Sequence, residues 1–168
     1  IRDKLVTGVQ TCALPILTFR NATTEDIDDI VALEHDCFPD PWSAKSFASS
    51  LDNPFCEVIV AVMQVKKPII VAYAVMLHMY EQGEIAKVAV APAYHRQGIA
   101  TEIVNWLIKI AEHEDVETIF LDVRESNEAA RKLYERVGFV QFDTTEGFYT
   151  NPPEASVKMR YDIGEPQC

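Results

Sequence analysis

The stretch IAKVAVAPAYHRQGIATEIVNWLIKIAEH, residues 85–113, decides the fold of this chain. Its first residues continue a run that begins two positions earlier, and this run, residues 83–90, is almost wholly apolar after Glu84. Such a run is typical of a strand buried on both faces. From Ala100 onward, apolar side chains recur at the i, i+3 and i+4 spacing of an amphipathic helix. A strand and a helix are therefore joined by YHRQGIAT, residues 94–101, a short connection with basic side chains and one glycine.

This connection is a candidate anion site. Gly98 can take backbone conformations that are closed to other residues, and the helix begins just after it. The first N–H groups of a helix have no partner inside it, and the helix dipole adds about half a positive charge there. Arg96 and His95 add side-chain charge, so we predict that the connection binds a phosphate or pyrophosphate. An ordinary connection is the alternative, because one glycine matches neither the Walker pattern nor GxGxxG.

The rest of the chain predicts one α/β domain. Alternating or continuous apolar runs predict strands at 17–20, 56–65, 69–80, 83–90, 118–123, 139–142 and 156–161. Helical spacing and capping residues predict helices at 25–37, 43–50, 100–111 and 127–137. Strands followed by strand–helix–strand–helix–strand give a mixed sheet with crossover connections near its centre.

The composition argues against some classes of protein. The chain has 168 residues, 48% of them hydrophobic, which is enough for a single core. A net charge of −11 argues against nucleic-acid binding, although it suits a basic protein partner or simply a soluble surface. No apolar run reaches the roughly 18 residues that a membrane span needs, so we expect no membrane association.

The cysteines and the chain ends complete this description. The four cysteines are widely spaced without a CxxC pair, so we expect no metal site and a reducing, cytoplasmic location. Residues 1–16 mimic a secretion signal only weakly, since polar residues interrupt their apolar run. We expect 1–16 to be a non-native or disordered tail, 17–163 to form the domain, and 164–168 to be a C-terminal tail.

Four stretches resemble a known family. The motif HRQGIA, residues 95–100, resembles the acyl-CoA signature Gln/Arg-x-x-Gly-x-Gly/Ala of the GNAT acetyltransferases, with His95 in place of Gln or Arg. FPDPWSAKSFASSL, VAVAPAYHRQGIAT, LDVRESNEAARKLYERVGF and GFYTNPPEASVKM occur in the order seen in RimI-type ribosomal-protein alanine N-acetyltransferases. The resemblance runs from about residue 17 to 163. It implies a GNAT fold, in which one mixed, mostly antiparallel sheet of about seven strands has helices on both faces and a splayed central strand pair.

The resemblance also implies where acetyl-CoA, the cosubstrate, would bind. The pyrophosphate would lie against Arg96, Gln97, Gly98, Ile99, Ala100 and Thr101. The pantetheine would run beside Val88, Ala89 and Val90 like an extra strand, and a main-chain amide there would stabilise the oxyanion. Asn127 would contact CoA as well. The last two assignments have structural alternatives. The segment VAV also suits a core strand, and Asn127 also suits a helix cap.

The family chemistry needs a proton donor for the thiolate and a way to deprotonate the amine. The resemblance makes Tyr134 the general acid, because a phenol with a pKa of about 10 can donate to a thiolate. A core aromatic is the alternative, since Tyr134 lies on an apolar stripe with Ala130, Leu133 and Val137. Asp122, where RimI-type enzymes usually have Glu, and Glu84 are the candidate bases. Water suffices if neither acts, because an α-amine has a pKa of only about 8.

The resemblance assigns the acceptor groove to two aromatic stretches. Phe38, Pro41 and Trp42 would form one wall, and Tyr149, in a loop, would form the other; packing beneath a loop is the alternative. The implied function is acetyl transfer from acetyl-CoA to the N-terminal α-amine of a protein, namely an N-terminal alanine of a small-subunit ribosomal protein. The alternatives are acetylation of a small amine or a lysine side chain, and a non-catalytic acyl-CoA-binding module. We expect a monomer or weak dimer.

Overall fold

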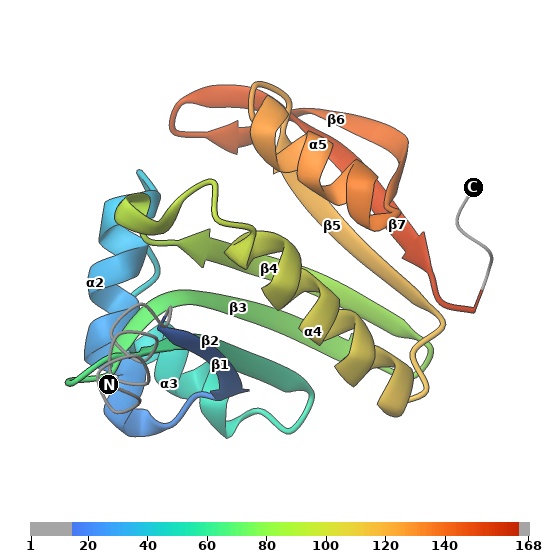
Figure 1. Cartoon of the computed structure of the whole chain (residues 1–168). Helices are drawn as coiled ribbons and strands as arrows, with labels where there is room; N and C mark the ends of the chain where they lie inside the picture. Colours follow the sequence, from blue (N-terminus) through green and yellow to red (C-terminus); the bar gives the residue numbers. More distant parts are fainter. Residues whose placement is uncertain (1–14, 165–168) are drawn as a thin grey trace, which may run out of the picture.

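The computed structural model describes residues 15–164, which form one sheet with helices on both faces (Figure 1). The strands are β1 (Ile16–Asn21), β2 (Cys56–Gln64), β3 (Ile69–Met79), β4 (Gln82–Val90), β5 (Thr118–Arg124), β6 (Val140–Thr150) and β7 (Pro153–Asp162). The helices are η1 (Thr24–Asp26), α2 (Ile27–Cys37), α3 (Ala44–Asp52), η2 (Pro92–Tyr94), α4 (Ile99–His113) and α5 (Glu128–Val137). Every strand and helix that the sequence predicts is therefore present.

The sheet has the predicted mixed topology. Its strand order is β1-β2-β3-β4-β5-β7-β6, and every neighbouring pair is antiparallel except β4 and β5. One core cluster, which contains Ile103 and Leu107, lies between the sheet and the helices α4 and α5. A second cluster, which contains Ile30 and Phe47, lies between the opposite face and the helices α2 and α3. The GNAT fold predicted by the resemblance is confirmed.

The central strands β4 and β5 pair only at their beginnings. Their register runs from Gln82 opposite Thr118 to Ile85 opposite Leu121 and then stops. On its other side, β4 carries one extra residue, because Ile85 opposes Met76 and Lys87 opposes Val75. Such a bulge bends a strand and increases its twist. Beyond it β4 and β5 separate, as Figure 1 shows, and this separation is the predicted splayed pair.

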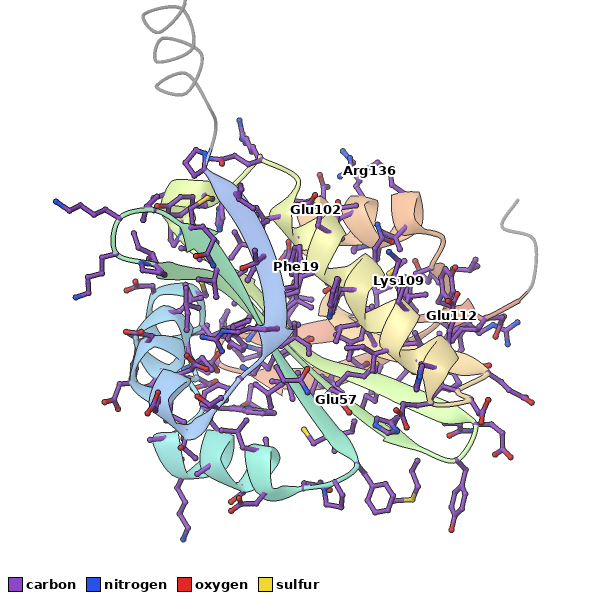
Figure 2. The ribbon with its side chains drawn as sticks, turned by 60° about the horizontal axis from the view of Figure 1, so that its bottom comes forward. Phe19, Glu57, Glu102, Lys109, Glu112 and Arg136 are labelled. Carbon is purple, nitrogen blue, oxygen red and sulfur yellow. The ribbon has the colours of Figure 1, made fainter. Side chains whose placement is uncertain are left out.

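Helix α4 buries the stripe that its sequence predicts. Its inward residues are almost completely buried and belong to the core cluster: Ile103, Val104, Leu107, Ile108 and Ala111. Figure 2 shows Glu102, Lys109 and Glu112 on the outer side of the helix, where all three are exposed. Trp106, at the edge of the stripe, stacks on Phe19 of β1 with 5.5 Å between ring centroids. These contacts hold α4 against the sheet, and the helix begins directly after Gly98.

Strand β6 differs from the prediction. The sequence predicts a short strand at 139–142 followed by a loop that carries Tyr149, but β6 continues to Thr150, and Tyr149 pairs with Glu154 of β7. The prediction of a loop is therefore wrong. Two register shifts, one after Gln141 and one after Thr145, let this polar segment continue as an irregular strand.

The predicted tails lie almost entirely outside the described residues, which exclude 1–14 and 165–168. Of the segment assigned to the N-terminal tail, Ile16 is the first residue of β1. It pairs with Gln64 and its side chain is 68% exposed. At the other end, β7 stops at Asp162, close to the predicted domain limit.

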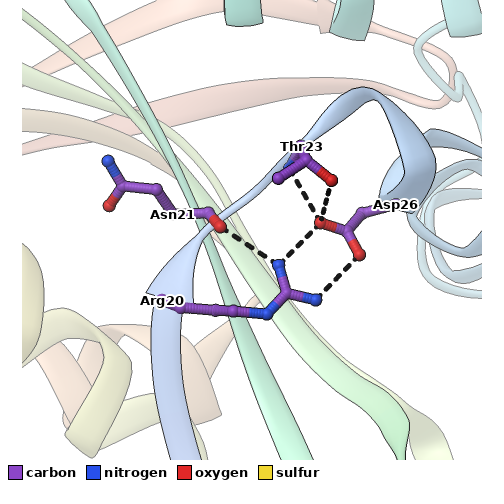
Figure 3. Close-up of polar contacts among 4 residues, drawn as sticks. All are labelled: Arg20, Asn21, Thr23 and Asp26. Carbon is purple, nitrogen blue, oxygen red and sulfur yellow. Dashed lines mark hydrogen bonds and ion pairs between the residues drawn. The ribbon is translucent and has the colours of Figure 1, made fainter.

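Asp26 fixes the turn from β1 into α2 (Figure 3). Arg20 donates to both carboxylate oxygens, with distances of 2.7 Å to Oδ2 and 2.9 Å to Oδ1. The main-chain N–H of Thr23 also donates to Oδ2 at 2.7 Å. The Asp26 residue is 7% exposed. The hydrogen bond from Arg20, followed by the bond from Thr23 and the charge of Arg20, lowers the pKa of Asp26 despite its burial.

Asp26→Asn should therefore destabilise the fold in a pH-dependent way. A carboxylate whose pKa is lowered on folding stabilises the fold above its unfolded pKa of about 3.9, and this contribution is lost as the pH falls through the folded value. We expect the substitution to lower the free energy of unfolding by about 1.5–3 kcal/mol at pH 7. Urea denaturation at pH 7 and pH 3 tests this, since the loss should be smaller at pH 3. An equal loss at both values would contradict the assignment, and exposed Asp36→Asn is the matched control.

Candidate active site

A cavity of about 380 Å³ lies where β4 and β5 separate. The loop between α2 and α3, strands β4, β5 and β6, and helix α5 all contribute to its wall. Segments that are far apart in the sequence therefore meet at one point. The residues singled out from the sequence that line it are Phe38, Val88, Asp122, Asn127, Tyr134 and Tyr149.

The remaining predicted site residues lie elsewhere. Glu84 lines a second hollow, next to this one. Ala89 and Val90 are buried in the core at the end of β4. Trp42 packs against Phe47 of α3, with 5.6 Å between ring centroids. Neither Pro41 nor Trp42 is part of the cavity wall, and neither is any residue of the Arg96–Thr101 connection.

Tyr134 is both a core aromatic and part of the cavity wall. The residue is 9% exposed, and its ring contacts Phe139 edge-on with 5.6 Å between centroids. Burial raises the pKa of Tyr134 above its ordinary value, and the neighbouring Tyr149 adds to this shift. The phenol is therefore protonated at neutral pH and can donate a hydrogen bond. The two interpretations of Tyr134 drawn from the sequence are compatible.

Asp122 lies on the less buried of the two faces of β5, along which buried and partly buried residues alternate. Its neighbours Leu121 and Val123 are buried on the opposite face. One carboxylate oxygen, Oδ1, accepts a hydrogen bond from the hydroxyl of Ser156, a fully buried residue of β7. Asp122 is thereby held at the wall of the cavity. Its charge also acts on Tyr149, whose pKa burial raises first and Asp122 raises further, against the opposing effect of Arg124.

Arg124 holds the β6–β7 hairpin over the cavity. Its guanidinium lies 4.1 Å from the centroid of the Tyr149 ring. It also donates to the carbonyl oxygens of Asn151 and Pro152 at 2.9 and 3.0 Å. Glu154 accepts from Arg124 at 3.3 Å. Arg124 was not predicted as a site residue, because nothing in the sequence pattern links it to partners 25 or more residues away.

Lys87 and Glu34 hold the opposite wall. The ammonium of Lys87 is 2.8 Å from Oε1 of Glu34 and 3.9 Å from the centroid of the Phe38 ring. Glu34 is completely buried and also accepts from the Trp42 main-chain N–H, at 2.8 Å, and from the Tyr73 hydroxyl. The loop with Phe38 and Trp42 is thus tied to β4. Neither Lys87 nor Glu34 was predicted as a site residue. A lysine within the apolar run IAKVAV is unusual, however, and could have indicated a buried ion pair.

The connection before α4 has the backbone that an anion site needs. Gly98 is the N-cap of α4 with φ of 79°, in the left-handed region that favours glycine. Arg96 also has a positive φ, 60°. The Nε2 atom of His95 lies 2.7 Å from the Val90 carbonyl oxygen, so this imidazole braces the end of β4. The N–H groups of the first turn of α4, by contrast, have no partner within the helix.

Two further kinds of site are not found among residues 15–164. No group of three or more His, Cys, Asp or Glu side chains there is placed to hold a metal ion. Within the same residues, no helix is long and apolar enough to cross a membrane.

Comparison with known proteins agrees with this geometry. The [ribosomal protein bS18]-alanine N-acetyltransferase of Escherichia coli is 29% identical over 148 residues, which are 87% of this chain and 97% of that protein. The crystal structure of the Escherichia coli ribosomal-protein alanine N-acetyltransferase has a TM-score of 0.80, covering 90% of this chain and 96% of that one. Arabidopsis thaliana NAA60 in complex with acetyl-CoA shares the fold, with a TM-score of 0.80 at 19% identity over 89% of this chain and all of that one.

The family assignment follows from a match across the whole centre of the domain. The family model described as "Acetyltransferase (GNAT) family" matches residues 27–139. That range contains the helix α2, the separating strands β4 and β5, the Gly98 connection and the helix α5 with Tyr134. The chain belongs to the acetyltransferase (GNAT) family.

Proposed function

We propose that this protein transfers the acetyl group of acetyl-CoA to the N-terminal α-amine of a protein, and that the acceptor is an N-terminal alanine of a small-subunit ribosomal protein. One observation supports the proposal: the carboxylate of Asp122, the buried phenol of Tyr134 and the part of the β4 edge that no longer pairs with β5 meet in one cavity. The similarity to the Escherichia coli enzyme, which is named for ribosomal protein bS18 alanine, supports the choice of acceptor. The net charge of −11 suits a basic partner in the cytoplasm.

The donor would be held by main-chain groups. The first turn of α4 after Gly98 offers unpaired N–H groups and a positive dipole end to the pyrophosphate. Beyond Ile85, the edge of β4 that faces β5 has no strand partner, so its main-chain groups are available to the pantetheine. A main-chain N–H near Val88 would also stabilise the oxyanion that forms on the thioester, and such donors contribute about 3 kcal/mol. Asn127 both caps α5, accepting from Ala130 N–H at 3.1 Å, and lines this side of the cavity.

The acceptor amine would enter between Phe38 and Tyr149. Asp122, the carboxylate nearest to Tyr149 in the cavity wall, would orient the amine and receive its proton directly or through water. The demand on this base is modest, because an α-amine has a pKa of about 8 and is partly neutral at pH 7. Lys87 stays paired with Glu34 on the opposite wall and serves to hold Phe38 in place.

In the transfer step, the amine nitrogen attacks the thioester carbonyl carbon. The carbon–nitrogen bond forms, the carbon–sulfur bond breaks, the nitrogen loses a proton and the sulfur gains one. Tyr134 is the donor that we assign to the sulfur. Burial keeps its pKa high, so the phenol stays protonated at neutral pH. Its hydrogen bond to the sulfur would strengthen as negative charge develops there, and its proton would be transferred as the thiolate leaves.

The direct test of the proposal uses purified protein, acetyl-CoA and a peptide that begins Ala-Arg. Mass spectrometry with fragmentation should find one acetyl group on the α-amine. A peptide with a blocked N-terminus and an internal lysine, and a panel of free amines, are the controls. Acetylation of these instead would favour a small-amine or lysine enzyme. CoA binding without any product would favour a non-catalytic module.

Tyr134→Phe should lower kcat by about 100-fold, because the ring is kept while the proton donor is lost. The dissociation constant of CoA should change by less than about twofold, since the assigned contacts to the donor are main-chain groups. Steady-state kinetics and calorimetric titration with CoA measure the two quantities. An unchanged kcat would remove Tyr134 from the mechanism. Phe139→Leu, which alters the ring packed against Tyr134, controls for a general loosening of the core.

Asp122→Asn separates the two candidate bases. If Asp122 accepts the proton, its loss should lower kcat/KM by about tenfold or more at pH 7, with partial recovery at pH 9, where the amine is already neutral. Glu84→Gln should have a clearly smaller effect on a short acceptor, because Glu84 lies in the adjoining hollow. The pH profiles of both variants, measured with a three-residue peptide, decide between them. A larger effect of Glu84→Gln would transfer the role to Glu84.

A further inference from the structure

A second hollow, of about 770 Å³, lies next to the active-site cavity. We call it the β3–β5 groove; it is formed by the end of β3, the β3–β4 turn, the beginning of β4, the middle of β5, one residue each of β6 and β7, and two residues of the loop before β2. Much of its wall is apolar and exposed. The large exposed hydrophobic side chains that line it are Phe55, Leu77, Met79, Tyr80 and Phe142, between 38% and 82% exposed.

The groove is continuous with the active site. Leu121 and Asp122 line both hollows, so the assigned base stands at their boundary. The groove extends along β4 to Gln82, which is paired with Thr118 of β5. Thr118 precedes Asp122 by four residues, a distance of about 13 Å along a strand. An extended segment of about four residues would span this length.

A hydrogen bond joins the two loops that border the cavity. The side-chain amide of Asn151, at the tip of the β6–β7 hairpin, donates to Asp40 of the α2–α3 loop at 2.9 Å. Asp40 itself lines the cavity. The two walls of the proposed acceptor site are therefore tied to each other, whereas the cavity and the β3–β5 groove meet at Leu121 and Asp122. A chain whose N-terminus lies at Asp122 has an open path along the groove.

The charged side chains of the groove indicate which kind of ligand it can bind. Three carboxylates line it, those of Glu81, Glu84 and Asp122, against one lysine, Lys158. Glu81 and Glu84 are exposed. An acidic, partly aromatic groove complements a peptide that carries both apolar and basic side chains.

We propose that the β3–β5 groove binds the residues of the protein substrate that follow its acetylated N-terminal residue. The occupant is an extended segment with apolar side chains against Met79 and Phe142 and an Arg or Lys near Glu81. This inference rests on the proposed function, since it extends the acceptor site of the same reaction. It makes the enzyme selective for sequence beyond the first residue.

The first test compares acceptors that differ only in the groove-binding part. A three-residue peptide beginning with Ala is compared with ten-residue peptides that share those residues and continue with apolar residues and either two Arg or two Glu. We expect kcat/KM to be at least tenfold higher for the Arg peptide than for the three-residue peptide, and lowest for the Glu peptide. Equal values for all three would overturn the proposal.

A charge reversal then tests the location. Glu81→Lys should reduce the preference for the Arg peptide over the Glu peptide by at least fivefold. It should leave kcat/KM for the three-residue peptide unchanged, a pattern that misfolding cannot produce. Met79→Ser combined with Phe142→Ser should raise KM for the ten-residue Arg peptide about fivefold or more. Ile69→Ser, which removes an exposed side chain at the opposite end of β3, is the matched control and should change nothing. Unchanged peptide preferences in both groove variants would overturn the proposal.

Two further measurements keep this inference distinct from the proposed function. If no peptide is acetylated, the proposed function fails, and fluorescence anisotropy of the labelled ten-residue peptides with CoA present still tests the groove. Weaker binding of the Arg peptide to Glu81→Lys would support it, and unchanged binding would overturn it. Sedimentation velocity provides the last outcome. If Met79→Ser with Phe142→Ser turns a dimer into a monomer but leaves the peptide kinetics unchanged, the groove is a self-association surface and the proposal is wrong.

Discussion

The site depends on one constraint, which is that β4 and β5 pair for four residues and then separate. Parallel strands with a continuous ladder would leave no space between them and no unpaired main-chain groups. The extra residue at Ala86 bends β4 away just where the pairing with β5 ends. β4 then leads through η2 to the Gly98 connection, so under the proposed function the strand edge and the helix N-terminus would contact the same acetyl-CoA molecule. Both clusters of the core hold β4 in this path, since Ile85 packs on one side and Ala89 on the other.

The two walls of the acceptor site are held by charged groups from those same two strands. Lys87, on β4, holds the α2–α3 loop through its ion pair with Glu34 and its contact with the Phe38 ring. Arg124, on β5, carries the β6–β7 hairpin through Tyr149 and the carbonyl oxygens of Asn151 and Pro152. Glu34 is completely buried, so removing Lys87 would leave its carboxylate uncompensated, which binds the α2–α3 loop strongly to β4. The two walls of the proposed acceptor site are therefore attached to β4 and to β5, respectively.

The sequence predicted the fold better than it predicted the walls of the cavity. Period and composition located α4 and β5, because those features repeat locally along the chain. The resemblance supplied Tyr134 and the splayed pair. Three features escaped: the full length of β6, the role of Arg124 and the burial of Glu34. Each depends on contacts between distant segments, and a polar residue looks alike in the sequence whether it is exposed or satisfied inside the fold. Tyr149 was found as a wall residue but assigned to a loop, because the irregular part of β6 lacks a regular alternation.

The shorter carboxylate at position 122 fits this arrangement of the site. An aspartate reaches one methylene less far than the glutamate usual in RimI-type sequences, and the hydroxyl of Ser156 holds it against the sheet. A shorter side chain at the cavity wall leaves room for a water molecule between the carboxylate and an amine, and an α-amine with a pKa of about 8 does not need a closer base. A lysine side chain, with a pKa of about 10.4, would need far more help to lose its proton. Under the proposed function, Asp122 would therefore suit an α-amine better than a lysine as acceptor, and its charge would also act on a basic segment in the adjoining groove.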